Sequence, residues 1–407
     1  MSTIGMYLRL ALRNVARNPR RSGLTILAIA FGLFCLIVFQ ALKVGMHREM
    51  IEGTLALDSA SLQIHAADYE SNLAVLKPMR DVETAMAALQ RVGAERFGLR
   101  LKAPALLLAG PRSSSVVLAG VDPAREPGVT LVAKRMVAGA YLGVPDTVVM
   151  GQALAQDLGL DVGGTVRLMA QNGSGMPAVR NFRVGGLFRT GLDSFDRGHV
   201  YFSLPDAQGF LSSAGAVTEI AANMPPDQAG AIAGELRQIL RPENFQVRTW
   251  EEVLPDLKQL IELNDATMGL LIAIVFAIVG MGIANTMSMV VFERFREFGV
   301  LAAIGTTPSG IVGLVMLESI LLGVLATLVG SVAGLAACVY LQHHGIDMSH
   351  FISNNQYFAA SHVLRAELRM SDLLLAGSVT LATALLAGIY PAWRAGRLEP
   401  VKALAHT

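Results

Sequence analysis

Four long apolar runs, separated by more polar sequence, dominate the hydrophobic pattern of the chain. They cover residues 22–42, 268–292, 310–341 and 372–392. A helix needs about 20 apolar residues to cross a bilayer, because the hydrocarbon core is about 30 Å thick and each residue rises about 1.5 Å. Every run is this long, so the pattern predicts an α-helical membrane protein with four transmembrane helices.

Basic residues beside these runs indicate how the chain is oriented. The residues before the first run are Arg9, Arg13, Arg17, Arg20 and Arg21, and those after the last run are Arg394, Arg397 and Lys402. Basic flanks remain in the cytoplasm, so both termini are predicted to be cytoplasmic. The long basic start and the lack of a cleavage pattern predict a retained anchor, not a removable signal peptide.

Spans and orientation together divide the chain into segments. In order, we expect a cytoplasmic amphipathic helix (1–21), the first membrane helix (22–45), an extracytoplasmic domain with stalk helices (46–265), the second membrane helix (266–292), a short cytoplasmic helix (293–309), the third membrane helix (310–341), a short external loop (342–371), the fourth membrane helix (372–392) and a cytoplasmic tail (393–407).

Residues 4–20 have the spacing of an amphipathic helix. Its apolar face is formed by Ile4, Leu8, Ala11, Leu12 and Val15, and Arg9, Arg13 and Arg17 recur on another face. Such a helix lies in the headgroup layer with its arginines toward lipid phosphates. The alternative is a soluble basic helix.

The external segment alternates strand-like and helix-like patterns, which predicts a mixed α+β domain. The strand-like stretches are 61–65, 165–169 and 181–188, and the helix-like stretches are 82–92 and 228–240. A helical stripe of Val253, Leu254, Leu257, Leu260 and Ile261 precedes the second membrane run. We expect that stripe to continue the membrane helix outward as a stalk.

Composition narrows the possible functions. Charged residues make up 16% of the chain, and average soluble domains have about 25%. The net charge of +1 argues against the broad basic face of a nucleic-acid-binding protein. Both cysteines, Cys35 and Cys338, lie in apolar runs, where we expect them to pack rather than form a disulfide framework.

No motif for catalysis was found. The chain has no G-x-x-x-x-G-K-[S/T] nucleotide loop, no G-x-S-x-G elbow and no H-E-x-x-H helix. Histidines at 343, 344, 350 and 362 gather near the second external loop. Their spacing matches no metal-binding pattern and favours a solvated loop. We therefore predict no catalytic residue, no metal and no cofactor on this chain.

Two features of the third run bear on helix packing. Ala326, Gly330, Gly334 and Cys338 recur at every fourth position, and small residues in this pattern let two helix backbones approach closely. Glu318 lies early in the same run, where a carboxylate is costly unless it is paired or near the interface. Anchoring near the headgroups is favoured over ion translocation for this residue.

The stretch from Glu293 to Gly305 has its charges in the first turn, followed by apolar and small residues. A short helix of this kind at the cytoplasmic surface could insert one face into a groove on a partner. The alternative is a simple interfacial turn.

Four motifs in order resemble one known family. The run 296–305 resembles the coupling segment of FtsX-like ABC transporter permeases, and 10–21 and 387–404 are similar to that family's opening and closing motifs. Gly120-Val-Asp-Pro123 and Val184-Gly-Gly-Leu-Phe188 resemble the MacB-type periplasmic core. The lipoprotein-releasing (LolC/LolE-like) permeases look nearest, because the membrane part has no fused ATPase and because of the run 203–208.

This resemblance implies a location, partners and a mechanism. The chain would lie in the bacterial inner membrane with its large domain in the periplasm. A cytoplasmic ABC ATPase dimer, carrying the ATP and Mg, would dock on two permease chains, either two copies or two paralogues. The stalks would transmit the ATPase motion to a lipoprotein substrate. Membrane lipids and a periplasmic lipoprotein carrier are further implied partners, and nucleic acid is not.

The resemblance also implies three sets of site residues. The ATPase-coupling set is Glu293, Arg296, Glu297, Gly299, Ala303 and Gly305. The substrate-cavity set is Leu36, Phe39, Gln40, Met268, Leu271 and Val275, for which plain packing or lipid contact is the alternative. The set for a loop that would hook the carrier is Asn172, Gly173, Met176, Pro177 and Arg180, within the short stretch 171–180.

Three functions remain open at this point. The chain is predicted to be a permease subunit, not an enzyme, that acts in lipoprotein release. MacB-like export of peptides or drugs is a second possibility. The third is an FtsX-like regulator that switches a cell-wall hydrolase outside the membrane.

Overall fold

The computed structural model describes residues 3–67, 69, 77–348 and 363–397. His350, His362 and the end of the closing motif at 399–404 lie outside the described residues. The chain forms two compact units. The helical unit comprises Met1–His47, Ile261–Ile346 and Leu364–Thr407, and the α+β unit comprises Arg48–Leu260 and Asp347–Val363.

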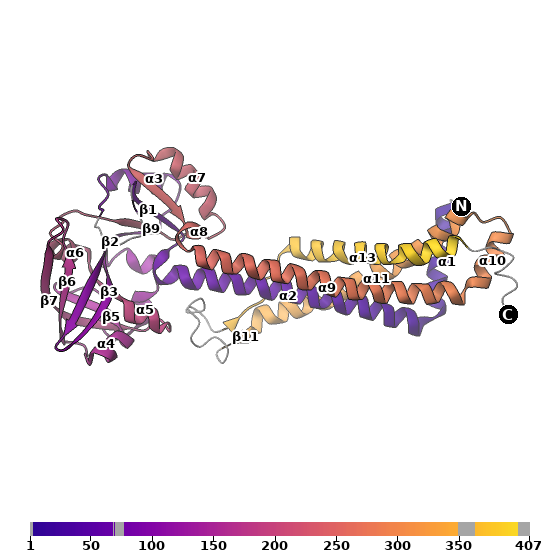
Figure 1. Ribbon diagram of the computed structural model, residues 1–407, viewed down its shortest axis with the longest axis horizontal. Coiled ribbons are helices and arrows are strands. Elements are labelled where there is room, and N and C mark those ends of the chain that lie inside the picture. Colours follow the sequence, from indigo (N-terminus) through magenta and orange to yellow (C-terminus); the bar gives the residue numbers. More distant parts are fainter. Residues whose placement is uncertain (1–2, 68, 70–76, 349–362, 398–407) are drawn as a thin grey trace. The chain divides into compact units, whose positions relative to one another are not determined.

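Four long helices characterise the helical unit (Figure 1). They are α2 (Pro19–Thr54), α9 (Pro255–Glu293), α11 (Pro308–His344) and α13 (Met370–Gly396). Within the described residues, these four are long and apolar enough to cross a membrane, as the sequence predicts. The 37 residues of α11 correspond to about 55 Å, more than the roughly 30 Å of the hydrocarbon core. This helix is therefore long enough to project past the bilayer.

A stripe of small residues brings α11 against α2. Ala326, Gly330, Gly334 and Cys338 are all buried. A Cβ atom added to Gly330 would lie 2.7 Å from the carbonyl oxygen of Ala30, and one added to Gly334 would lie 3.0 Å from Ile37. The close helix approach predicted from this stripe is therefore present, and its partner is α2.

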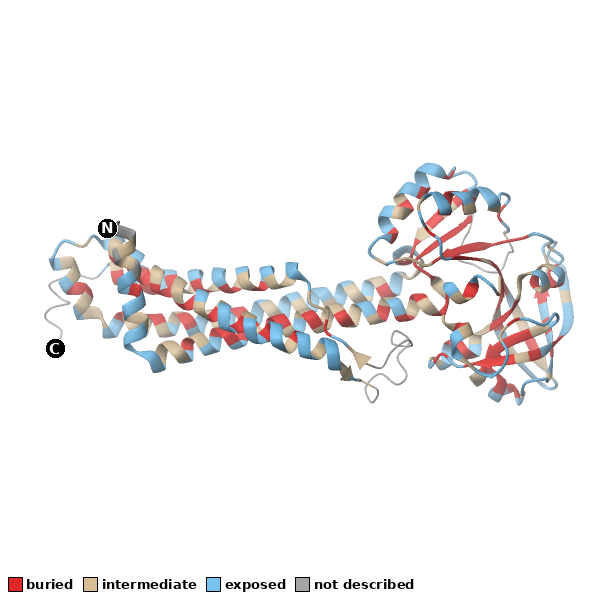
Figure 2. Cartoon of the chain, turned by 180° about the vertical axis from the view of Figure 1, so that it is seen from behind, coloured by how far each residue is buried: buried red, intermediate tan, exposed pale blue. Residues whose placement is uncertain are grey.

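The apolar side chains of α9 are packed much less. Only 11% of its apolar window is buried, compared with 44% for α11. Figure 2 shows exposed residues, in pale blue, along the long helices. Among the exposed side chains of α9 are Leu270, Ile274, Ile278 and Met281. These residues are available to contact lipid or another membrane-embedded chain.

Two short helices complete this unit, α1 (Thr3–Arg17) and α10 (Phe295–Ala303). The two-residue strands β11 (Ile346–Asp347) and β12 (Val363–Leu364) pair with each other. Helix α1 packs on α11 through Tyr7, Ala11 and Val15. Leu12, also on the predicted apolar face, is 47% exposed and remains available to lipid. The side chains of Ile4 and Leu8 lie outside what the structure describes.

The α+β unit is built on one ten-stranded sheet. Its strands are β1 (Leu62–Ala66), β2 (Phe97–Ala109), β3 (Arg112–Val121), β4 (Met136–Gly139), β5 (Thr147–Gly151), β6 (Thr165–Gln171), β7 (Pro177–Phe188), β8 (His199–Ser203), β9 (Glu219–Ala222) and β10 (Phe245–Thr249). The order is β10-β1-β9-β2-β3-β8-β5-β7-β4, and β6 pairs with β2 and β7. The pairs β3–β8 and β5–β7 are parallel, and the other pairs are antiparallel.

Helices cover this sheet and close two apolar cores. The helices are α3 (Val82–Arg91), α4 (Gln152–Leu158), α5 (Asp193–Gly198), α6 (Leu204–Phe210), α7 (Ala229–Ile239) and α8 (Trp250–Val253). One core gathers around Val149, Phe182 and Tyr201, and the other around Ile64 and Leu236. This architecture agrees with the predicted combination of four membrane helices and an α+β domain.

The predicted stalk stripe does not form one helix. Helix α8 ends at Val253, and Leu254 has φ −120° and ψ 64° before α9 begins at Pro255. Proline disfavours a helical conformation at the residue before it, so Pro255 ends one helix and begins the next. The stalk part of α9 therefore starts at Pro255, and Val253 and Leu254 lie outside it.

We predict that Gly330→Ala lowers the free energy of unfolding by about 1–3 kcal/mol, because the added methyl group collides with the backbone of α2. The measurement is thermal unfolding of the purified full-length chain in detergent. Gly282→Ala on α9 is the matched control, since a Cβ there meets nothing within 4 Å. Equal losses at the two positions would contradict the packing described here.

Candidate functional site

Helix α10 is the short helix between the second and third membrane helices. Arg294 is the N-cap residue of α10. Two residues of the helix itself, Phe298 and Gly299, are buried. At its end, Gly305 has φ +99°, Thr306 N–H donates to the Leu301 carbonyl at 2.9 Å, and Thr307 caps α11. A left-handed residue of this kind commonly ends a helix, and glycine adopts it without strain. Gly305 therefore serves the turn into α11.

A cluster of three arginines and three glutamates surrounds the start of α10. Arg294 donates through Nε to Glu297 Oε2 at 2.8 Å and through Nη1 to Glu318 Oε1 at 2.7 Å. Arg17 of α1 also donates to Glu297. Arg21 of α2 donates to Glu293 Oε2 at 2.5 Å and to the Thr286 carbonyl at 2.9 Å. The formal charges of the six side chains cancel.

Glu318 lies at the centre of this cluster. It is the eleventh residue of α11, about 15 Å along the helix axis from Pro308, and it is 3% exposed. Besides Arg294, the side-chain amide of Asn14 donates to its Oε1. A buried carboxylate is tolerated when it is paired and hydrogen-bonded. Glu318 is thus anchored by α1 and by the residue that starts α10.

The electrostatics of α10 agree with this pairing. Burial by itself would lower the pKa of Arg294, but Glu318 and Glu297 more than offset it and raise that pKa. Burial by itself would raise the pKa of Glu297, but hydrogen bonds from Arg294 and Arg17 lower it overall. Both side chains therefore remain charged at neutral pH.

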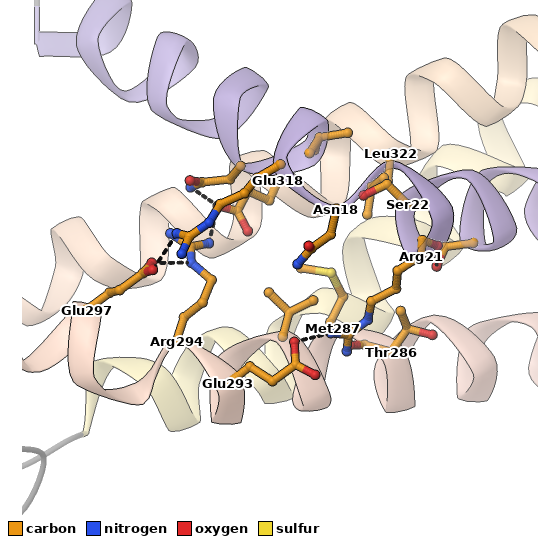
Figure 3. Close-up of a pocket in the computed structure, with 15 residues that line it drawn as sticks. Asn18, Arg21, Ser22, Thr286, Met287, Glu293, Arg294, Glu297, Glu318 and Leu322 are labelled. Carbon is orange, nitrogen blue, oxygen red and sulfur yellow. Dashed lines mark hydrogen bonds and ion pairs between the residues drawn. The ribbon is translucent and has the colours of Figure 1, made fainter. Parts of the chain in front are cut away.

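The cluster borders a cavity of about 180 Å³, shown with its lining side chains in Figure 3. Residues of α1, α2, α9 and α11 line it together with Arg294 and Glu297 at α10. Glu318 and Arg294 point toward one another, and Arg21 reaches toward Glu293 and Thr286 in the same view (Figure 3). Four helices thus meet around the start of α10.

The opposite face of α10 is exposed. It carries Arg296, Val300, Ala303 and Ile304, and the exposed fractions of Val300 and Ile304 are 47% and 74%. These positions are spaced by three or four residues or lie next to each other, so they form one stripe. Exposed apolar residues on a short helix are the arrangement by which such a helix inserts into a groove on a partner.

The six predicted coupling residues therefore divide into two groups. Arg296 and Ala303 lie on the exposed stripe. Glu293 and Glu297 accept from Arg21 and Arg17, Gly299 is buried, and Gly305 forms the terminal turn of the helix. Arg17 was expected to face lipid phosphates, but it donates to Glu297 because a carboxylate partner lies within reach.

The predicted substrate-cavity residues also lie in two environments. Leu36 is 7% exposed and packs inside the helical unit with Ile37 and Phe276. Phe39, Leu271 and Val275 are exposed, whereas Gln40 and Met268 are half-buried. Leu36 is therefore held by the chain's own helices, and the exposed three are the ones that another molecule can reach.

The predicted hook loop is shorter than the sequence suggested. Strand β6 ends at Gln171 and β7 begins at Pro177, so Pro177 and Arg180 lie in β7 and not in a loop. The Asn172 side chain accepts from the N–H groups of Ser174 and Met176, and Gly173 N–H donates to the Leu211 carbonyl at 3.1 Å. Hydrogen bonds fold this turn tightly, and Met176 remains 62% exposed.

Two important residues of the cluster were missed by sequence reasoning. Asn14 was one polar residue in a basic helix, and Arg294 was one of several charges in a turn. The available signal was the buried carboxylate at Glu318, which requires a cation and a donor. Within the described residues, no group of three histidine, cysteine or acidic side chains that could hold a metal was found.

Known families match most of the chain. The FtsX-like permease C-terminal family matches residues 269–400, and the MacB-like periplasmic core domain family matches residues 22–239. A lipoprotein-releasing system transmembrane protein LolC from Xylella fastidiosa (strain Temecula1 / ATCC 700964) is 26% identical over 415 residues, which cover 96% of both chains. A LolC from Neisseria meningitidis serogroup B is 24% identical over 97% of both chains. A macrolide export ATP-binding/permease protein MacB from Syntrophobacter fumaroxidans is 31% identical over 40% of this chain and 21% of its own.

We predict that Arg294→Met lowers the free energy of unfolding by about 3–5 kcal/mol, because it leaves the buried Glu318 carboxylate without its cation. The double variant Arg294→Met with Glu318→Met should recover most of that loss, since no buried charge then remains. Thermal unfolding of the full-length chain in detergent measures both. Arg296→Met is the control on the exposed stripe and should change little. Simple addition of the two single effects would contradict the pairing.

Proposed function

The chain belongs to the permease family that combines a MacB-like periplasmic core domain with an FtsX-like C-terminal region, and on that basis we propose that it couples a separate ABC ATPase to lipoprotein release from the bacterial inner membrane. The observation that carries the proposal is the match to LolC proteins along 96% of their length and of this chain. Membership of an ABC permease family implies an ATPase partner. The cargo and the remaining partners are part of the proposal.

The ATPase would bind the exposed stripe of α10. Arg296, Val300, Ala303 and Ile304 offer one cation and a small apolar surface. Helix α10 can transmit force because Arg294, at its start, is paired with the buried Glu318 of α11. A push on the stripe would therefore reach α11 directly. This geometry favours a role for Glu297 in holding α10 and not in direct contact with the ATPase.

A second permease chain would cover part of α9. This helix is the least packed of the four, so its apolar residues need either lipid or a protein partner. The exposed side chains of Phe39, Leu271 and Val275 are the part of the predicted cargo set that a lipid-anchored substrate can reach. Both termini would be cytoplasmic and the α+β unit periplasmic, as the basic flanks predict.

Ile304→Asp should weaken co-purification of the ATPase by roughly tenfold or more, because it places a charge in the centre of the apolar stripe. The measurement is ATPase recovered with the affinity-tagged permease from membranes. Ile304→Leu, which keeps the apolar surface, should bind normally, as should Val144→Asp on the exposed surface of the α+β unit. Undiminished binding by Ile304→Asp would place the ATPase elsewhere.

The cargo proposal is tested in vesicles that contain the permease, its ATPase and a fluorescent lipoprotein. We expect ATP-dependent transfer of the lipoprotein to a soluble acceptor, and no transfer when the ATPase carries a substitution that blocks hydrolysis. ATP-dependent loss of an encapsulated macrolide without lipoprotein transfer would instead support MacB-like export. ATP-dependent activation of an added cell-wall hydrolase, again without transfer, would support the regulator.

A further inference from the structure

The far end of α2 enters the α+β unit through an unusual turn. Residues Leu55–Ser59 form a π-helix, in which the Ala60 N–H donates to the Leu55 carbonyl at 3.0 Å. Leu55 and Leu57 are buried beneath it. Ala60 has φ +53°, a conformation that costs a non-glycine residue about 1–3 kcal/mol and persists only where the surroundings enforce it. Packing therefore fixes this turn firmly.

The backbone of the turn is bonded to the α+β unit. The last carbonyls of a helix have no partner within the helix. Here the Ala56 carbonyl accepts from Leu131 N–H at 2.8 Å, and the Ser59 carbonyl accepts from the Gln63 side chain at 2.6 Å. The Asp58 carbonyl accepts from Arg100 of β2. Three backbone contacts thus hold the turn that ends α2.

A buried charge cluster strengthens this attachment. Lys102 Nζ lies 2.7 Å from Asp58 Oδ2 and 3.0 Å from Glu219 Oε2. Arg100, which is 0% exposed, lies 2.7 Å from Glu219, 2.8 Å from Glu126 and 3.7 Å from Asp58. Burial would lower the pKa of Lys102, but Asp58 and Glu219 raise it overall. Ion pairs therefore keep the buried Lys102 charged.

The cluster contains more negative than positive side chains, and this difference distinguishes the role of Asp58 from that of the other four. Two cations, Arg100 and Lys102, face three carboxylates, Asp58, Glu126 and Glu219. Asp58 alone lies on the turn that ends α2. Without Asp58, the remaining two cations and two carboxylates still balance, because Lys102 and Arg100 both keep Glu219. Asp58 is thus positioned to attach α2, and the other four can hold together without it.

The start of α9 is attached differently. Leu257 is buried there, and the Leu254 N–H donates to the Trp250 carbonyl at 2.8 Å. Helix α8 stops at Val253, Leu254 is not helical, and Pro255 begins α9. Across this break, Lys258 Nζ lies 3.2 Å from Glu251 Oε2, and both side chains are more than two-fifths exposed. Exposed pairs of this kind contribute little to rigidity. A helix that is interrupted at a proline can bend there as a hinge.

We propose that Asp58, held by Lys102 and Arg100, is the positioning residue that makes the end of α2 and the sheet of the α+β unit move as one body, whereas α9 meets that unit at a hinge formed by Leu254 and Pro255. The inference rests on the proposed ATP-driven function. In this proposal, α2 transmits motion to the α+β unit, and α9 bends where it meets that unit.

Spin-label distances in the full-length permease–ATPase complex test directly whether Asp58 attaches α2 to the sheet; this attachment is called the joint below. Labels replace the exposed residues Glu52 on α2, Ser115 on β3 and Gln259 on α9, in a background where Cys35 and Cys338 are alanine. The Glu52–Ser115 distance should be narrow and unchanged by ATP, and the Gln259–Ser115 distance should change with ATP. A Glu52–Ser115 distance that changes with ATP in the unsubstituted joint would overturn the proposal.

Two substitutions then separate attachment from stability. Asp58→Ala should broaden the Glu52–Ser115 distribution and reduce lipoprotein transferred per ATP by roughly fivefold or more, with ATPase binding intact. Glu126→Gln keeps Asp58 in place, so it should lower the unfolding temperature more than Asp58→Ala and leave the distribution narrow. Asp157→Asn, in an exposed pair with Arg197, is the control and should change neither readout.

The outcomes distinguish the joint from the proposed cargo. An unchanged distribution in Asp58→Ala, or broadening by Glu126→Gln alone, would overturn the joint even if lipoprotein transfer proceeds. Broadening in Asp58→Ala without any lipoprotein transfer by the parent complex would support the joint and remove the cargo proposal instead.

Discussion

The contact between Arg294 and Glu318 is the interaction on which the arrangement of the helical unit depends. A carboxylate at this depth in α11 needs a cation, and the cation comes from the residue that starts α10. The short helix therefore cannot drift away from the membrane helices without exposing an unpaired buried charge. Asn14 extends the same constraint to α1, and Arg21 of α2 pairs separately with Glu293. The buried charge of Glu318 thus holds α1 and α10 against α11.

This constraint gives α10 two faces with different tasks. Its inner face is occupied by Phe298 and by ion pairs, so it cannot be offered to a partner. Its outer stripe of Arg296, Val300, Ala303 and Ile304 is exposed and can be offered to a partner. Such a helix can transmit a force that a partner applies to its exposed face, because rigid contacts hold its inner face.

Long-range periodicity explains what the sequence could predict. The four apolar helices, the small-residue stripe of α11 and the α+β character of the external segment follow from patterns repeated over many residues. The pairing of charges does not, because Arg17 and Glu297 are separated by 280 positions and no local pattern brings them together. Pro255 was visible in the sequence, but the apolar stripe around it outweighed the signal of a break. The cluster at Asp58 escaped notice for the same reason as the first one: its members come from distant segments.

Helix α2 takes part in both charge clusters, and this gives it a different task from α9. Near its start, Arg21 connects α2 to Glu293 and to the Thr286 carbonyl at the end of α9, so the two helices are tied together beside α10. At the other end, α2 is fixed in the sheet through Asp58, whereas α9 is interrupted at Leu254. Under the proposal, α2 and not α9 is the helix that would transmit motion to the sheet, because Asp58 fixes α2 there and α9 can bend at Leu254 and Pro255.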